Sequence, residues 1–199
     1  MKTLHWIAYA ASLLTSGLSH AGKQAEEPLV ASVRGALSAS LQEKTNPRFA
    51  PKDDFSAHNY QRWLARADQL LGKRRKDLSP TARADLLETA YYEATRAGLE
   101  PALVLGLIQV ESNFRSHAIS HADARGLMQV MPFWTRLVGD GDTRKLFDSH
   151  VNLRYGCTIL RHYLDIERGN LFRALGRYNG SLGKAEYPNT VLAAWQAWK

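Results

Sequence analysis

The stretch "LVLGLIQVESNF" at residues 103–114 places one carboxylate, Glu111, inside a run of apolar residues. Leu107, Ile108 and Phe114 lie three or four positions from it, on the same face of a predicted helix. Burial there would raise the pKa of the Glu111 carboxyl by roughly one or two units, because desolvation disfavours the charged form. An acid that stays protonated near neutral pH is suited to protonate a leaving oxygen. A salt-bridged structural glutamate is the alternative, and on general grounds the more common outcome.

Helical patterns occur on both sides of this stretch. Before it, Leu29, Val33, Leu37 and Leu41 recur every four residues. Further helices are predicted at residues 60–71, 79–98, 152–164, 171–177 and 191–198, and another helix begins at Pro101. Residues 45–55 are predicted to be a linker and residues 138–142 a turn. Residues 116–132 are predicted to form a loop, then a short turn, then a helix. No convincing alternating strand pattern and no repeat is present, so the sequence predicts an all-α fold, or nearly so.

The first 21 residues have the layout of a secretory signal peptide. Lys2 precedes the apolar run "LHWIAYAASLL", and small residues at Ser19 and Ala21 suit cleavage after Ala21. An uncleaved anchor is the alternative, but the run is shorter than the ~20 residues that a spanning helix needs. No later segment is long or apolar enough to span a membrane. We therefore expect export to a bacterial periplasm, with a helical extension and linker at 22–78 and the main domain at 79–199.

The composition is that of a globular protein that can bury one sizeable core. The chain has 199 residues, 45% of them hydrophobic, and a formal charge of +7. Cys157 is the only cysteine, which excludes an internal disulfide and predicts a buried structural thiol. The basic run "GKRRK", with Lys73–Lys76, could meet nucleic acid, anionic cell wall or lipid headgroups, or could be cations at a helix C-terminus. For an exported protein, nucleic acid is not the predicted partner.

A second notable segment is "SHADARGLMQVMP", residues 120–132. Gly126 permits close backbone approach, and Met128 and Val130 are ordinary core formers. Gln129 is an amide between apolar neighbours, which suggests a hydrogen-bonding task.

Together with Glu111, this segment closely resembles the soluble lytic transglycosylase catalytic domain of the lysozyme-like superfamily. The family pattern Glu-Ser-x-Phe stands here at residues 111–114. The further matches are Ser120, Ala124, Gly126, Leu127, Met128, Gln129 and Pro132, then Asn152, Gly156, Tyr163 and Leu164, then Tyr178 and Asn179, and the closing segment "YPNTVL". The resemblance covers about residues 80–199, in the family's order, and does not cover residues 22–78.

The resemblance implies a lysozyme-like fold and cleavage of the bond between N-acetylmuramic acid and N-acetylglucosamine in peptidoglycan glycan strands. Glu111 would be general acid and then general base for attack by the sugar's own 6-hydroxyl, which closes a 1,6-anhydro ring. A single carboxylate is then sufficient, unlike in paired-carboxylate glycosidases. No metal or cofactor is implied.

The resemblance also implies a set of substrate-binding residues, which are Ser120, Met128, Gln129, Tyr178 and Asn179. Met128 and Gln129 would line the cleft, Ser120 would contact sugar, and Tyr178 would hydrogen-bond near Glu111, with Asn179 supporting the same wall. By their residue types alone, Met128 could equally be core packing. Tyr178 and Asn179 could belong to a helix-end turn, "YNG".

Several positions depart from the family pattern. Asp123 stands in place of glycine, Arg177 replaces a small residue, and Phe133 and Trp134 either shape the cleft or pack against the extension. Asp123 suggests an alternative function. If its carboxylate lay about 6.5–9.5 Å from the Glu111 carboxyl and held a water between them, the enzyme would be a lysozyme-like hydrolase.

Another class of function is a binding module, which would bind glycan, or a component of a secretion or conjugation machine, without cleaving glycan. Cell-wall or secretion machinery is also a candidate partner of an active enzyme. Metal sites are not predicted: His117 and His121 lack the HExxH pattern, and "GDGD" at 139–142 lacks the remaining ligands of a calcium loop.

Overall fold

The computed structural model describes residues 26, 31–42 and 48–199, and the predicted signal peptide lies outside these ranges. The helices are α1 (Ala31–Leu41), α2 (Asp54–Arg74), α3 (Pro80–Arg96), α4 (Pro101–Ser112), α5 (Phe133–Val138), the 3-10 helix η1 (Thr143–Phe147), α6 (Ser149–Ile166), α7 (Leu171–Asn179) and α8 (Glu186–Trp198). Within the described ranges, β pairing is limited to isolated bridges from Arg125 to Ile119 and to Val130. The predicted nearly all-α class is therefore confirmed.

Local sequence signals set several helix ends as predicted. Ser79 caps α3, where its side chain accepts a hydrogen bond from the Ala82 N–H at 3.1 Å, and Pro80 is the first helical residue. Gly98 follows the end of α3 in the left-handed conformation (φ 64°). α4 starts at Pro101, also as predicted.

The prediction of a helix just before Pro132 was wrong. In residues 116–132 the backbone groups pair across a narrow loop, with the Arg125 and Val130 N–H groups each donating to the other's carbonyl at 3.0 and 2.9 Å. Gln129 has φ 49°, which a helix does not allow. The helix that follows this loop is α5, which begins at Phe133.

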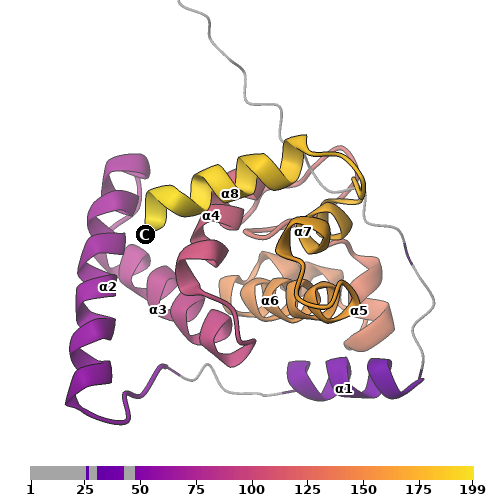
Figure 1. Cartoon of the computed structure of the whole chain (residues 1–199), viewed down its shortest axis with the longest axis horizontal. Coiled ribbons are helices and arrows are strands. Elements are labelled where there is room, and N and C mark those ends of the chain that lie inside the picture. Colours follow the sequence, from indigo (N-terminus) through magenta and orange to yellow (C-terminus); the bar gives the residue numbers. More distant parts are fainter. Residues whose placement is uncertain (1–25, 27–30, 43–47) are drawn as a thin grey trace, which may run out of the picture.

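α4 is the central helix, and its middle residues are buried on every side. α8 lies along it (Figure 1), so closely that a Cβ on Gly106 would stand 2.6 Å from the Trp195 backbone nitrogen. Only a glycine permits this approach of the two backbones. α8 starts at Glu186, five residues before the predicted helix, and this brings Tyr187 into its first turn.

The helical extension packs on the main domain in two places. α2 lies against α3 (Figure 1), joined by an ion pair between Arg83 and Asp68 at 2.7 Å. Aromatic rings of Phe49, Tyr60 and Trp63 surround the Tyr91 ring of α3. α1 contacts α5 and α6.

The interior combines an apolar core with one buried ionic cluster. Phe133 and Trp134 belong to that core, on the helix that α1 contacts. Cys157 is fully buried, as predicted, and burial raises the pKa of its thiol. The Glu93 carboxylate pairs with Arg96 at 2.7 Å and Arg154 at 2.9 Å, which balances its charge in the interior.

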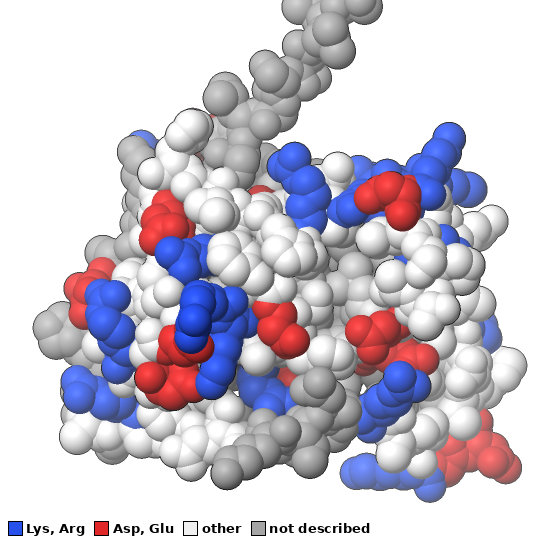
Figure 2. All heavy atoms as spheres, turned by 180° about the vertical axis from the view of Figure 1, so that it is seen from behind, with Lys and Arg blue, Asp and Glu red and all other residues white. Residues whose placement is uncertain are grey.

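Charged side chains are mixed on the molecular surface. Figure 2 shows lysines and arginines interspersed with aspartates and glutamates rather than gathered in a single basic patch on that face. Within residues 26, 31–42 and 48–199, none of the helices is both long and apolar enough to cross a bilayer.

Asn152 of α6 fixes the loop of residues 116–132 to the helical core. Its side chain is 1% exposed and accepts a hydrogen bond from the Met128 N–H at 2.8 Å. It also donates to the carbonyls of Arg125 at 2.8 Å and Leu146 at 2.7 Å. Gly126 passes so close (φ 75°) that an added Cβ would stand 2.3 Å from the Asn152 amide nitrogen. One amide therefore makes three of the hydrogen bonds that hold this loop.

We expect Asn152→Ala to lower the free energy of unfolding by about 3 kcal/mol, because the buried Met128 N–H and Leu146 carbonyl lose this partner and the Arg125 carbonyl keeps only the Val130 N–H. Denaturant unfolding measures this change. Asn59→Ala, at an exposed position of α2, is the control and should stay within about 0.5 kcal/mol of wild type. Equal midpoints for Asn152→Ala and wild type would show that the amide does not hold the loop.

Candidate active site

Glu111 lies in the last turn of α4 and is 2% exposed. Burial raises the pKa of its carboxyl from 4.5 to about 8, against a smaller lowering effect of a hydrogen bond from Tyr187. The rise is larger than the one or two units expected from sequence, because side chains from several helices, and not α4 alone, exclude water. A carboxyl with this pKa is mostly protonated at neutral pH.

Tyr187, in the first turn of α8, is the hydrogen-bond partner of Glu111. Its hydroxyl is buried and donates to Glu111 Oε1. The other oxygen, Oε2, is buried and has no hydrogen-bond partner among the described residues. Because Oε1 already accepts a hydrogen bond, the acidic proton belongs on Oε2, where it can be given to a bound group.

Tyr187→Phe is expected to move the alkaline limit of activity to higher pH, because the lost hydrogen bond favoured the carboxylate over the acid. The rate at pH 6 should fall about fivefold to tenfold, the effect of one hydrogen bond of about 1–1.4 kcal/mol that orients the carboxyl. A pH–rate profile of the peptidoglycan cleavage that the family resemblance implies measures both. Tyr91→Phe, in the aromatic cluster on α3, is the control. If the alkaline limit of activity did not move, Tyr187 would have no effect on the pKa of Glu111.

Tyr178 lies at the end of α7, beside this pair. Its hydroxyl donates to the Met128 carbonyl oxygen at 2.8 Å and not to Glu111. Burial, and then the negative charge of Glu111, raise the pKa of Tyr178 well above its usual value. The turn "YNG" does end a helix, with Gly180 left-handed (φ 69°). Tyr178 thus has both a helix-end position and a place near the acid.

Asn179 and Gln129 each present a buried oxygen without a partner in the described part of the chain. The Asn179 amide nitrogen donates to Ser181 Oγ at 3.0 Å, which leaves its Oδ1 unpaired. The Gln129 amide nitrogen donates to the carbonyls of Gly126 at 3.0 Å and Ala118 at 3.2 Å, which leaves its Oε1 unpaired. Buried polar atoms without partners are rare, and each calls for an explanation such as a catalytic or binding role.

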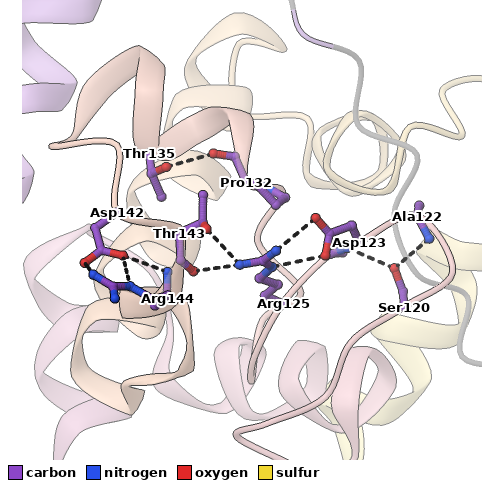
Figure 3. A network of polar contacts seen from close by, with 10 residues as sticks. Ser120, Ala122, Asp123, Arg125, Pro132, Thr135, Asp142, Thr143 and Arg144 are labelled. Atoms are coloured by element: carbon purple, nitrogen blue, oxygen red, sulfur yellow. Dashed lines mark hydrogen bonds and ion pairs between the residues drawn. The ribbon is translucent and has the colours of Figure 1, made fainter.

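Met128 and Ser120 have structural contacts in this conformation. Met128 is 0% exposed and packs against Gly156, so core packing describes its side chain and no surface of it faces solvent. Ser120 is half-buried, and its hydroxyl accepts hydrogen bonds from the N–H groups of Ala122 at 3.2 Å and Ala124 at 3.0 Å. Figure 3 shows Ser120 at one end of a polar network that continues to Asp123 and Arg125.

Asp123 takes the left-handed conformation (φ 65°) that explains a glycine at this family position. Aspartate tolerates this region better than most residues, so the loop keeps its course. Both carboxylate oxygens accept from the Arg125 guanidinium at 3.1 Å, and Arg125 in turn donates to the Thr143 hydroxyl at 2.8 Å (Figure 3). This engagement disfavours Asp123 as the water-holding carboxylate of a hydrolase.

No group of three or more metal-ligating side chains occurs in the ranges that the structure describes. The His117 ring stacks on Phe147 at 5.8 Å between centroids. In the "GDGD" turn, Asp140 pairs with Lys145, and Asp142 pairs with Arg144 at 3.0 Å.

Tyr187, Arg125 and Asn152 are site-forming residues to which no function is assigned by sequence alone. Only the likeness of "YPNTVL" to the family's closing segment marked the neighbourhood of Tyr187. Its partner Glu111 is 76 residues away, beyond the reach of any local pattern.

Comparison with known proteins identifies the family of the chain. Residues 88–190 match the model of the Transglycosylase SLT domain. The chain is 41% identical over 85 residues to a membrane-bound lytic murein transglycosylase C of Actinobacillus pleuropneumoniae serotype 5b, an alignment of 42% of this chain and 22% of that protein. It is 35% identical over 105 residues to the protein of the same name from Haemophilus influenzae (strain PittEE), 45% of this chain and 29% of that one. The chain thus spans less than a third of the length of these relatives.

Since the family match covers more than half of the chain and includes Glu111, Gln129 and Tyr187, the chain belongs to the transglycosylase SLT domain family.

Proposed function

We propose that this chain is a lytic transglycosylase that cleaves peptidoglycan between N-acetylmuramic acid and N-acetylglucosamine without water. The observation that carries the proposal is the state of Glu111, a buried carboxyl whose pKa is raised to about 8 and whose Oε2 is unpaired. The family match and the names of the relatives support the same substrate.

Glu111 acts twice in the proposed reaction. Its Oε2 first donates a proton to the glycosidic oxygen while the bond from that oxygen to C1 of the muramic acid breaks. The resulting Glu111 carboxylate then takes the proton of the muramic acid 6-hydroxyl, whose oxygen attacks C1 and closes the 1,6-anhydro ring. The N-acetyl carbonyl of the same sugar stabilises the cationic intermediate. The proton balance returns Glu111 to its acid form, so neither a cofactor nor a second carboxylate takes part.

The unpaired amide oxygens supply acceptors for the glycan. Gln129 Oε1 and Asn179 Oδ1 are suited to accept from sugar hydroxyls or an acetamido N–H. Tyr187 holds Oε1 so that Oε2 faces the leaving oxygen. Because Oε2 is closed off from solvent in this structure, glycan binding has to open a path to it.

Two other functions receive less support. A hydrolase would need a second carboxylate to hold water, and Asp123 is committed to Arg125. A module that only grips glycan has no use for a buried acid with a raised pKa, since burying a carboxyl without an ion-pair partner costs stability.

Digestion of purified sacculi tests the function directly. Mass spectrometry of the muropeptides should show 1,6-anhydro-muramic acid ends, each one water lighter than a reducing end. If only reducing ends are found, the protein is a hydrolase. If the sacculi stay intact, the glycan-binding module is the function that remains.

We also propose that the protein acts outside the cytoplasm, because residues 1–21 have the layout of a signal peptide and the proposed substrate lies there. Cell fractionation should find a mature form that begins near Gly22 in the periplasmic fraction. A full-length form confined to the cytoplasm would contradict this.

A further inference from the structure

The turn that follows Glu111 has an uncommon backbone conformation. Asn113 (φ 48°) and Phe114 (φ 61°) are consecutive residues in the left-handed region, and neither is glycine. Such a conformation costs on the order of 1–3 kcal/mol for a bulky residue and persists only where its surroundings hold it. The turn begins two residues after Glu111, so its shape sets where the last turn of α4 presents the carboxyl.

Arg75, the residue directly after α2, holds this turn from one side. One terminal nitrogen of its guanidinium donates to the carbonyl oxygens of both Asn113, at 3.2 Å, and Phe114. The opposite edge of the guanidinium makes two hydrogen bonds to the Asp77 carboxylate, at 2.8 and 2.6 Å. The Arg75 side chain is only 14% exposed, although it comes from the basic run "GKRRK". Its rigid, planar shape lets one side chain join the two groups.

Trp198 of α8 holds the turn from the other side. Its ring packs against the Phe114 ring at 5.3 Å between centroids, and its indole N–H donates to Gln109 of α4 at 2.9 Å. Arg75 and Trp198 both lie outside residues 88–190, the part of the chain that matches the family model. The turn after Glu111 is therefore held by segments that flank the family domain.

We propose that Arg75, oriented by Asp77, is a positioning residue for Glu111, and that the catalytic unit of this chain therefore includes the end of α2. This inference rests on the proposed function. The helical extension would then take part in catalysis as well as in packing. The predicted boundary between the extension (22–78) and the main domain (79–199) would separate Arg75 from the acid that it positions.

The physical effect of losing Arg75 follows from the contacts. Without the guanidinium, the two carbonyls lose their donor and the strained turn can relax, which shifts the end of α4. A shift of about 1 Å in a catalytic group can cost about 100-fold in rate. Water that enters beside Glu111 would also lower its pKa, because burial is what raises it. Glycan contacts made by Gln129 and Asn179 would be unaffected.

The test uses the full chain and soluble, uncross-linked glycan strands. Arg75→Ala should lower kcat at least about tenfold with KM within about twofold, and should move the alkaline limit of activity to lower pH. Arg75→Lys should recover part of kcat, because an ammonium can reach a carbonyl but cannot also pair with Asp77 in two bonds. Asp77→Asn should give a smaller loss than Arg75→Ala.

Two arginine variants are the matched controls. Arg74→Ala removes an exposed neighbour in the same basic run and should match wild type. Arg83→Ala breaks the ion pair with Asp68, and so weakens the contact between α2 and α3 without touching the turn. It should lower the melting temperature but leave the alkaline limit of activity in place.

The inference is overturned if Arg75→Ala keeps wild-type kcat, or if its loss matches that of Arg83→Ala with the alkaline limit unmoved. If Arg75→Ala does not fold, Arg75→Lys and Asp77→Asn decide the question by the same readouts. Failure of the proposed function would look different, since wild type itself would then form no anhydro ends.

Discussion

Glu111→Gln is expected to lower the rate of anhydro-muropeptide release from sacculi by about three orders of magnitude. The amide has nearly the same shape and its oxygen can still accept the Tyr187 hydrogen bond, but it has no proton to donate to the leaving oxygen. General acid–base catalysis by one positioned group contributes about 10²–10⁴-fold, and here one group serves in both steps. Chromatography of the soluble products over time measures the rate.

Glu100→Gln is the matched control for this variant. It makes the same chemical change just before α4, at an exposed position, and should keep the wild-type rate. Binding of the Glu111→Gln protein to sacculi, measured by co-sedimentation, should persist because the acid is not needed to hold glycan. If Glu111→Gln cleared sacculi as fast as wild type, the assignment of Glu111 as catalytic acid would be wrong.

The second large effect is a loss of stability at alkaline pH. The Glu111 pKa is 4.5 in the unfolded chain and about 8 in the folded protein. Below pH 4.5 both states are protonated, so the residue does not favour either. Between pH 4.5 and 8 the unfolded chain gives up the proton and the folded protein keeps it, so the free energy of unfolding falls as pH rises. Above pH 8 the folded protein carries a buried charge, at a cost of about 5 kcal/mol, since one unit corresponds to about 1.36 kcal/mol.

Glu111→Gln should remove this pH dependence, because glutamine does not titrate. Denaturant unfolding at pH 5 and pH 9 should show wild type and variant close together at pH 5 and the variant more stable by several kcal/mol at pH 9. Glu100→Gln should follow wild type at both values. Parallel profiles for wild type and Glu111→Gln would mean that the Glu111 pKa is not raised. The gain in stability with the loss of activity would show that burial of this acid costs stability and serves catalysis.

Much of the fold follows from local sequence. Ser79 and Pro80 start α3, Gly98 ends it and Pro101 starts α4, because capping and proline geometry act within one helical turn. The apolar spacing around Glu111 likewise identified a buried carboxyl on a helix. The helix predicted before Pro132 is absent because the backbone of that loop pairs with itself, and two of its left-handed residues, Asp123 and Gln129, are not the glycines that would mark such a turn in the sequence.

The working parts of the site depend on contacts between residues far apart in the chain. Tyr187 reaches Glu111 across 76 residues, and Arg75 reaches the turn after Glu111 across 39. Residue spacing specifies which helices form and which faces are apolar, since those preferences act over a few residues. Which hydroxyl meets the acid, how far water is excluded from it, and which arginine holds its turn are decided only when α2, α4 and α8 pack together. The sequence therefore identifies the acid, and the packing of distant helices sets its pKa and its partners.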